Sequence, residues 1–182
     1  MTRHTQLRII DNCVGFLEQA VDLVQRIDDG VFAATSPLSP RGSIGGHLRH
    51  VVDFFQSFLN GLERGQINYN LRQRDPRFEH DRVYAVWRLN EMIAALKAVP
   101  LAAGERTLLV NTEDAPADAP ADAPDWSTSS VQRELDTLQS HTVHHYAIVA
   151  MLLRLHEIDP GPEFGVAPST IRFWNEPAVF AG

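Results

Sequence analysis

Hydrophobic residues recur at helical spacing in the first third of the chain. One stripe alternates between spacings of three and four residues: Leu7, Ile10, Val14, Leu17, Val21 and Val24. This pattern predicts a long amphipathic helix that ends near residues 28–30, where Gly30 can adopt the left-handed closing conformation. A second stripe predicts a helix from an N-cap at Ser43 to about Gly65; its members are Ile44, Leu48, Val51, Phe55, Phe58, Leu59 and Leu62.

Two further helices are predicted in the second half. The third runs from about Glu79 to Val99, and five of its apolar side chains are expected to face inward: Val83, Val86, Trp87, Ile93 and Ala94. The fourth begins at Ser129 or Ser130, because Ser129 and Gln132 have the spacing of a capping box. It should end near Ile158, just before Pro160.

The segments between these helices differ in character. Residues 66–78 are polar and are expected to form a structured loop. Residues 107–110 favour a short strand, which could pair in a hairpin with residues near Trp126. Residues at about 113–125 repeat Ala, Pro and Asp, a composition that cannot bury a core, so we expect a mobile insertion there.

Four long helices in one chain favour an all-α fold, a four-helix bundle with a short hairpin or irregular insertion before the last long helix. The 182 residues fit a single helical-bundle domain spanning 1–182. The tail beyond Pro160 is too apolar to lie free, and we expect it to pack on the bundle or on a partner chain. Its apolar residues are Phe164, Val166, Ile171, Phe173 and Trp174.

The composition and charge of the chain indicate which classes of partner it is expected to bind. The formal net charge is −7, and no basic cluster of the kind that binds nucleic acid is present. No run approaches the roughly 18 apolar residues that a membrane span requires. The single cysteine, Cys13, allows no intrachain disulfide. We therefore expect a cytoplasmic protein that binds neither nucleic acid nor membrane.

The histidines carry the candidate chemistry. Five of the eight fall in two clusters, at positions 47 and 50 and at positions 141, 144 and 145. At about 100° per residue, His145 lies within the apolar stripe of the fourth helix, His141 at its edge and His144 toward solvent. On the second helix the same geometry slightly favours His47 over His50 as the inward histidine.

A lone buried histidine is usually a hydrogen-bonded core residue. Three converging imidazoles favour a divalent metal instead, since buried ring nitrogens without partners cost about 1–3 kcal/mol each. Imidazole ligands suit zinc, nickel and iron alike, so the sequence does not identify the ion.

Two segments resemble the DinB-like superfamily of small bacterial helical proteins: residues 43–53 (SIGGHLRHVVD) and residues 141–145 (HTVHH). The resemblance implies up-down-down-up helix order, a three-histidine metal site and a homodimer. Its His-x-x-Asp stretch matches His50 and Asp53, which makes His50 the implied ligand together with His141 and His145. His47, Asp53 and His144 then become alternative ligands or neighbours of the metal.

Three functions stay open at this stage. Three protein ligands leave a position for water or substrate, which favours a metal-dependent hydrolase or a thiol-dependent transferase acting on a small molecule. His47 or His144 could be an acid or base, and Tyr69, Arg72 and Arg74 could bind an anionic substrate if their loop covers the site. That loop could equally be a solvated connector. The alternatives to an enzyme are a metal-stabilised dimeric sensor or scaffold, and a purely structural histidine cluster.

Overall fold

The computed structural model describes residues 3–36, 42–100, 106–111 and 126–176. Their elements follow one another along the chain as α1 (Arg3–Arg26), α2 (Asp29–Ala33), α3 (Ile44–Leu62), β1 (Gln66–Asn68), the short 3₁₀ helix η1 (Pro76–Glu79), α4 (Arg82–Lys97), β2 (Thr107–Asn111), β3 (Trp126–Ser130), α5 (Val131–Leu155) and α6 (Pro168–Asn175). The predicted Ala/Pro/Asp insertion at 113–125 lies outside the described residues.

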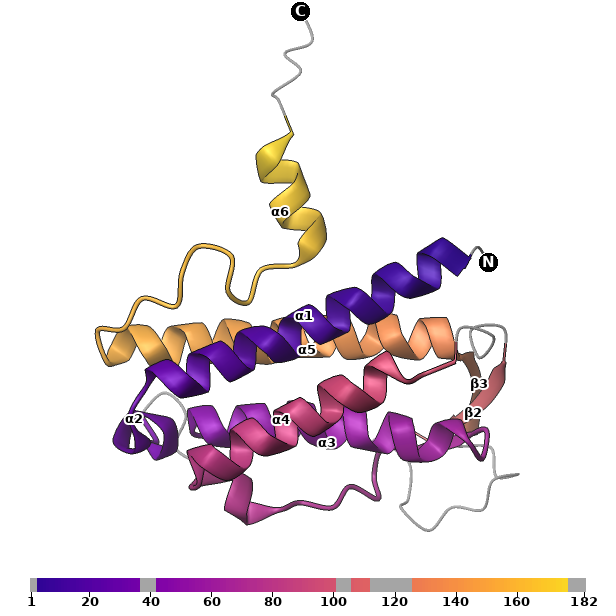
Figure 1. Cartoon of the computed structure of the whole chain (residues 1–182), viewed down its shortest axis with the longest axis horizontal. Helices are drawn as coiled ribbons and strands as arrows, with labels where there is room; N and C mark the ends of the chain where they lie inside the picture. Colours follow the sequence, from indigo (N-terminus) through magenta and orange to yellow (C-terminus); the bar gives the residue numbers. More distant parts are fainter. Residues whose placement is uncertain (1–2, 37–41, 101–105, 112–125, 177–182) are drawn as a thin grey trace, which may run out of the picture.

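Four long helices form the body of the molecule (Figure 1). Helix α1 packs on α4 and α5, and α3 packs on the same two helices. The start of α4 lies beside the end of α1, where Arg82 pairs with Asp29, and its end pairs through Lys97 with Glu18. Helices α1 and α5 therefore run one way and α3 and α4 the other, as Figure 1 shows.

A small sheet closes one end of these helices, which corrects the predicted fold class. Strand β2 pairs with β3 in antiparallel register, so the predicted hairpin is confirmed. The same strand pairs in parallel with β1, within the stretch we predicted to be a loop. The all-α four-helix bundle is therefore wrong: the fold is helical with a three-stranded mixed sheet. Strand β1 has only three residues, too few to show an alternating pattern.

Side-chain caps set the starts of the helices that carry the histidines. The Ser43 hydroxyl accepts a hydrogen bond from the Gly46 N–H at 3.0 Å, which confirms the predicted start of α3. At α5 the cap is Ser130, whose hydroxyl accepts from the Arg133 N–H. Ser129 lies in β3 and donates its hydroxyl proton to Glu134. Ser130, and not the predicted capping box of Ser129 and Gln132, therefore caps α5.

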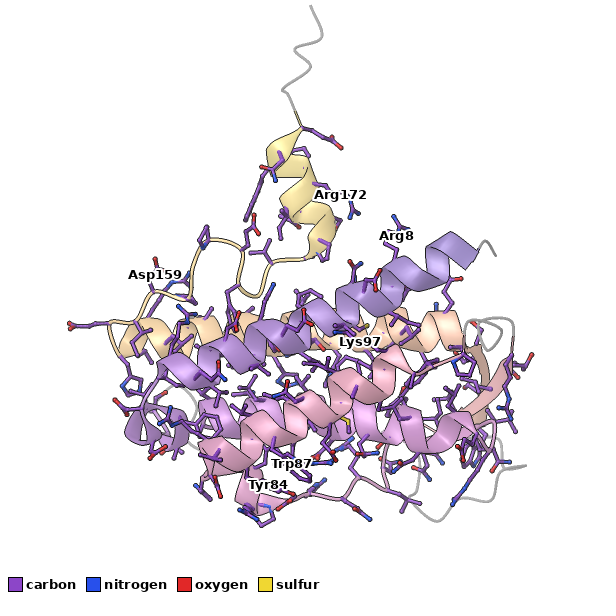
Figure 2. The ribbon with its side chains drawn as sticks, viewed as in Figure 1. Arg8, Tyr84, Trp87, Lys97, Asp159 and Arg172 are labelled. Atoms are coloured by element: carbon purple, nitrogen blue, oxygen red, sulfur yellow. The ribbon has the colours of Figure 1, made fainter. Side chains whose placement is uncertain are left out.

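The predicted inward face of α4 is only partly correct: Ile93 is buried and Val86 packs against the core, but the other three residues are exposed. Val83 and Trp87 are 83% and 50% exposed, and Ala94 is exposed as well. Figure 2 marks Trp87 next to Tyr84, away from the bundle interior. The buried stripe has the spacing four, three and four, and consists of Ala85, Leu89, Met92 and Leu96, with Ile93 beside it. Apolar residues occur all round this helix, so periodicity alone could not select the inward face.

The tail divides into two parts. Phe164 is buried, and its ring stacks on the ring of Tyr146 at 4.8 Å, as predicted for a tail that packs back on the bundle. Helix α6 then projects away from the body (Figure 1) and has no buried residue. Phe173 and Trp174 on it are 73% and 56% exposed. Among the described residues, no helix is both long and apolar enough to cross a membrane.

Candidate metal centre

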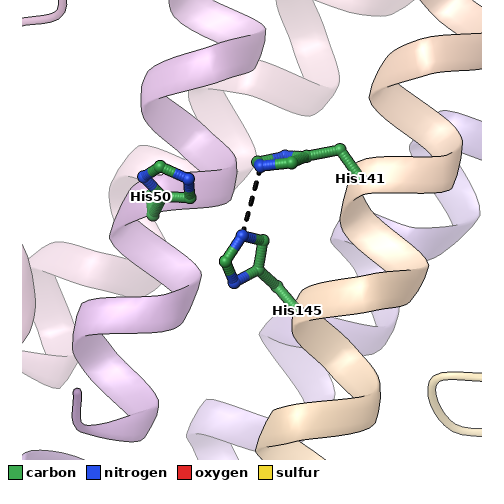
Figure 3. Close-up of side chains that lie close together, drawn as sticks. All are labelled: His50, His141 and His145. Carbon is green, nitrogen blue, oxygen red and sulfur yellow. Dashed lines mark hydrogen bonds between the residues drawn. The ribbon is translucent and has the colours of Figure 1, made fainter. Parts of the chain in front are cut away.

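Helices α3 and α5 lie side by side and bring three histidines together (Figure 3). His50 comes from α3, and His141 and His145 come from successive turns of α5. One ring nitrogen from each of the three lies within 4.8 Å of the other two. All three rings are half-buried, so the cluster is partly open to solvent and does not lie in the closed core. These are the three histidines that the DinB-like resemblance implied, whereas helical geometry alone had slightly favoured His47 over His50.

The spacing of the nitrogens fits a metal ion. The Nε2 atoms of His141 and His145 are 3.1 Å apart. A tetrahedral site with metal–nitrogen bonds of about 2.0–2.1 Å separates its ligand atoms by roughly 3.3 Å. The ring centroids of His50 lie 4.9 Å from His141 and 4.6 Å from His145. Small rotations of the rings would bring the three nitrogens onto one ion.

The electrostatics also favour ligation. Burial, together with the smaller effect of the neighbouring histidines, lowers the pKa of His50 and of His145 to about 3. Arg72 and Arg49 also lower the pKa of His50. These two rings are therefore neutral at physiological pH, and each keeps a nitrogen lone pair available. Neutral imidazole is the form that binds a metal.

His47 contacts the second ring nitrogen of His145, the one that does not face His141. The Nδ1 atoms of the two rings are 3.0 Å apart, whereas Nε2 of His145 faces His141. His145 thus presents one nitrogen to the metal position and the other to His47. One of the two neutral imidazoles must donate and the other accept. If Nε2 of His145 bound a metal, Nδ1 of His145 would carry the proton and donate it to His47. His47 is not among the three histidines that converge, so the structure favours His50 on α3.

The remaining predicted neighbours point elsewhere. Asp53 is 7% exposed and forms an ion pair with Arg49, which also binds Glu79 at 2.6 Å. Burial raises the pKa of Asp53 to about 6, and the positive charge of Arg49 opposes that rise. His144 is exposed on α5, with its ring centroid 5.1 Å from that of His145. Neither residue belongs to the converging group.

Phe54 forms an apolar wall of the centre. Its ring centroid lies 4.1 Å from that of His141 and 4.9 Å from that of His50. Tyr69 stacks on the same ring at 5.1 Å. We did not predict Phe54 as part of the site, although it follows His50 by four residues and so shares its helix face. That spacing was the signal available in the sequence.

The predicted substrate loop contributes one residue to the surroundings of the centre. Tyr69 is buried, and its hydroxyl donates to the Glu134 carboxylate at 2.9 Å, so its role is to tie the loop to α5. Arg74 is exposed. Arg72 is half-buried, and its guanidinium carbon lies 4.6 Å above the Phe54 ring. Of the three, Arg72 is the residue placed beside the histidines.

Comparison of the chain with models of protein families, with curated proteins and with solved structures found no match. The resemblance to DinB-like proteins and the homodimer that it implies therefore stay predictions. Any functional proposal depends on the chemistry of the histidine cluster itself.

Proposed function

We propose that this protein binds one divalent metal ion through His50, His141 and His145 and uses it to transform a small molecule. The observation that supports the proposal is the convergence of three half-buried imidazoles from two helices, with one nitrogen of each within 4.8 Å of the others. Zinc, nickel and iron all suit such a donor set.

The donor set favours an enzyme over a structural metal. A structural zinc site usually has four protein ligands, whereas catalytic sites have three and leave one position for water or substrate. The described residues provide three at this point. When bound, an ion held in this way lowers the pKa of a coordinated water or thiol and polarises a carbonyl group. We infer hydrolysis or thiol-dependent transfer as the reaction class.

The surrounding residues have separate tasks in this proposal. His47 orients His145 through the contact between their Nδ1 atoms. Phe54 covers His50 and His141 with an apolar ring and keeps bulk water from that side. Tyr69 stacks on Phe54 and anchors it to α5 through Glu134. These contacts hold the ligands in place before the ion binds, which reduces the cost of ordering them.

Metal content tests the proposal directly. We expect the protein, purified without a histidine tag, to contain one equivalent of metal by elemental analysis. The variants His50→Ala, His141→Ala and His145→Ala should each lose most of it, because each removes one of three ligands. The matched control is His80→Ala, since His80 is exposed at the end of η1 and should leave metal content unchanged. Unchanged metal in all three ligand variants would refute the metal centre.

A cobalt-substituted protein tests whether a coordination position is open. Addition of azide should alter the visible spectrum of bound cobalt if an exchangeable position exists. A spectrum that azide does not alter would argue for a closed site and against catalysis.

A further inference from the structure

Arg72 stands at a fixed place next to the histidine cluster. Its guanidinium carbon lies 4.6 Å above the Phe54 ring, and its Nη1 donates to the Tyr69 carbonyl at 2.6 Å. The same Phe54 ring is 4.1 Å from the ring of His141. A guanidinium held by stacking and by a backbone acceptor loses little further freedom when it binds a ligand.

The charge of Arg72 reaches the cluster. Arg72 lies over the Phe54 ring, whose centre is 4.9 Å from that of the His50 ring, so its positive charge is close to the histidines. Arg49 is already engaged by the carboxylates of Asp53 and Glu79. A divalent ion would add further positive charge. The carboxylates of Asp53 and Glu79 offset the charges of the two arginines, so a bound divalent ion would supply the excess positive charge that attracts an anion.

We propose that Arg72 binds an anionic group of the substrate, a carboxylate or a phosphate, while another part of the same molecule reaches the metal. This proposal rests on the metal centre proposed above. The planar guanidinium matches carboxylate and phosphate oxygens in a two-point contact. Arg72 and His141 both contact the Phe54 ring, so the proposed substrate is a small molecule that reaches around or along this ring. The site therefore selects small, negatively charged substrates over neutral ones of the same size.

Two thiols of similar size test the proposal on the cobalt-substituted protein. 3-Mercaptopropionate carries a carboxylate and 2-mercaptoethanol does not, and both bind cobalt through sulfur with a change in the visible spectrum. We expect the wild-type protein to prefer the charged thiol. In Arg72→Gln this preference should fall about tenfold or more, because charge-assisted hydrogen bonds contribute at that level. Affinity for 2-mercaptoethanol should stay the same.

Two further variants make the result specific. Arg77→Gln removes the same charge at an exposed position over the Tyr84 ring and should keep the wild-type preference. Arg72→Lys should retain only part of it, since an ammonium cannot make the two-point contact. Unchanged 2-mercaptoethanol affinity shows that a variant has folded around its metal.

The outcomes separate the two proposals. An equal preference in wild-type protein and Arg72→Gln, or an equal loss in Arg77→Gln, would overturn the role of Arg72 and leave the metal centre intact. Failure of the wild-type protein to bind cobalt would refute the metal centre, and the anion site with it.

Discussion

At the scale of single residues, the two nitrogens of His145 distinguish the roles that we propose for the two histidines of α3, with His50 as a metal ligand and His47 as a support. Nε2 of His145 faces His141, and Nδ1 lies 3.0 Å from Nδ1 of His47. Metal-binding histidines commonly use their second nitrogen in this way, and the partner sets both tautomer and orientation. The helical stripe slightly favoured His47. Such a stripe indicates which side chains point toward the core, but it does not show which ring nitrogen faces the metal position.

The positioning role of His47 can be measured as metal affinity. We expect His47→Ala to weaken metal binding about 10- to 100-fold, because the orientation of His145 is no longer fixed. Competition with a chromophoric chelator gives the dissociation constant. His144→Ala is the control, since His144 is exposed and lies beside the same ring. Equal affinities in His47→Ala and the wild-type protein would remove His47 from the site.

The low pKa values of His50 and His145 predict how the metal-free protein responds to acid. Both stay neutral in the folded state down to about pH 3, whereas unfolded histidine takes up a proton near pH 6.5. Between these limits the unfolded state binds more protons, so stability falls as the pH falls. Asp53, with its pKa raised to about 6, acts in the opposite direction but is one group against two.

Urea denaturation in the presence of a chelator measures this effect. We expect the free energy of unfolding to decrease from pH 7 to pH 5, and to decrease less steeply in His145→Gln, which lacks one of the two titrating rings. The same slope in both proteins would contradict the assignment.

At the scale of elements, the junction between α3 and β1 depends on a glycine. A Cβ atom at Gly61 would lie 2.4 Å from the Gln66 carbonyl oxygen and 2.7 Å from Cγ1 of Ile67. Only glycine lets the last turn of α3 approach the strand that follows it. This contact places β1 against the helix that carries His50 and starts the loop that carries Tyr69 and Arg72.

We expect Gly61→Ala to destabilise the protein by about 1–3 kcal/mol, because the backbone of β1 must move to admit the methyl group. Gly15→Ala is the matched control, since a Cβ in that helix would meet no atom within 4 Å. That change should be neutral or stabilise the protein by up to about 1 kcal/mol through helix propensity. Chemical denaturation measures both variants, and equal stabilities would show that the junction can relax freely.

At the scale of the whole molecule, the chain beyond α5 packs on the body mainly before α6, around Phe164. Phe164 is 9% exposed and stacks on Tyr146, whose hydroxyl donates to the Phe16 carbonyl at 2.6 Å. Helix α6 lies past this contact and buries none of its residues. The segment that leads to α6 therefore belongs to the core, whereas α6 itself adds little to the stability of a single chain.

Two variants separate the contribution of Phe164 to stability from that of α6. Phe164→Ala should cost about 3 kcal/mol, as expected for loss of a buried aromatic ring. Removal of residues 167–182 should change the free energy of unfolding by less than about 1 kcal/mol, because α6 buries none of its own residues. Thermal and urea denaturation compare the two. A truncated chain as unstable as Phe164→Ala would show that α6 supports the fold.

The sequence by itself determined the long helices, the Ser43 cap, the hairpin and the pair His141 and His145, because periodicity and capping are local properties of a helix or strand. On α3 the periodicity slightly favoured His47, and the tertiary structure places His50 with that pair. It did not determine the inward face of α4, where apolar residues such as Val83 and Trp87 also occur on the outer side. Nor did it reveal the parallel pairing of β1 with β2, which joins segments about forty residues apart. The tertiary structure alone decided which nitrogen of His145 faces His141 and where Arg72 lies. The orientation of the His145 ring and the position of Arg72 depend on how α3, α5 and the loop after β1 pack together. No local sequence pattern predicts that packing.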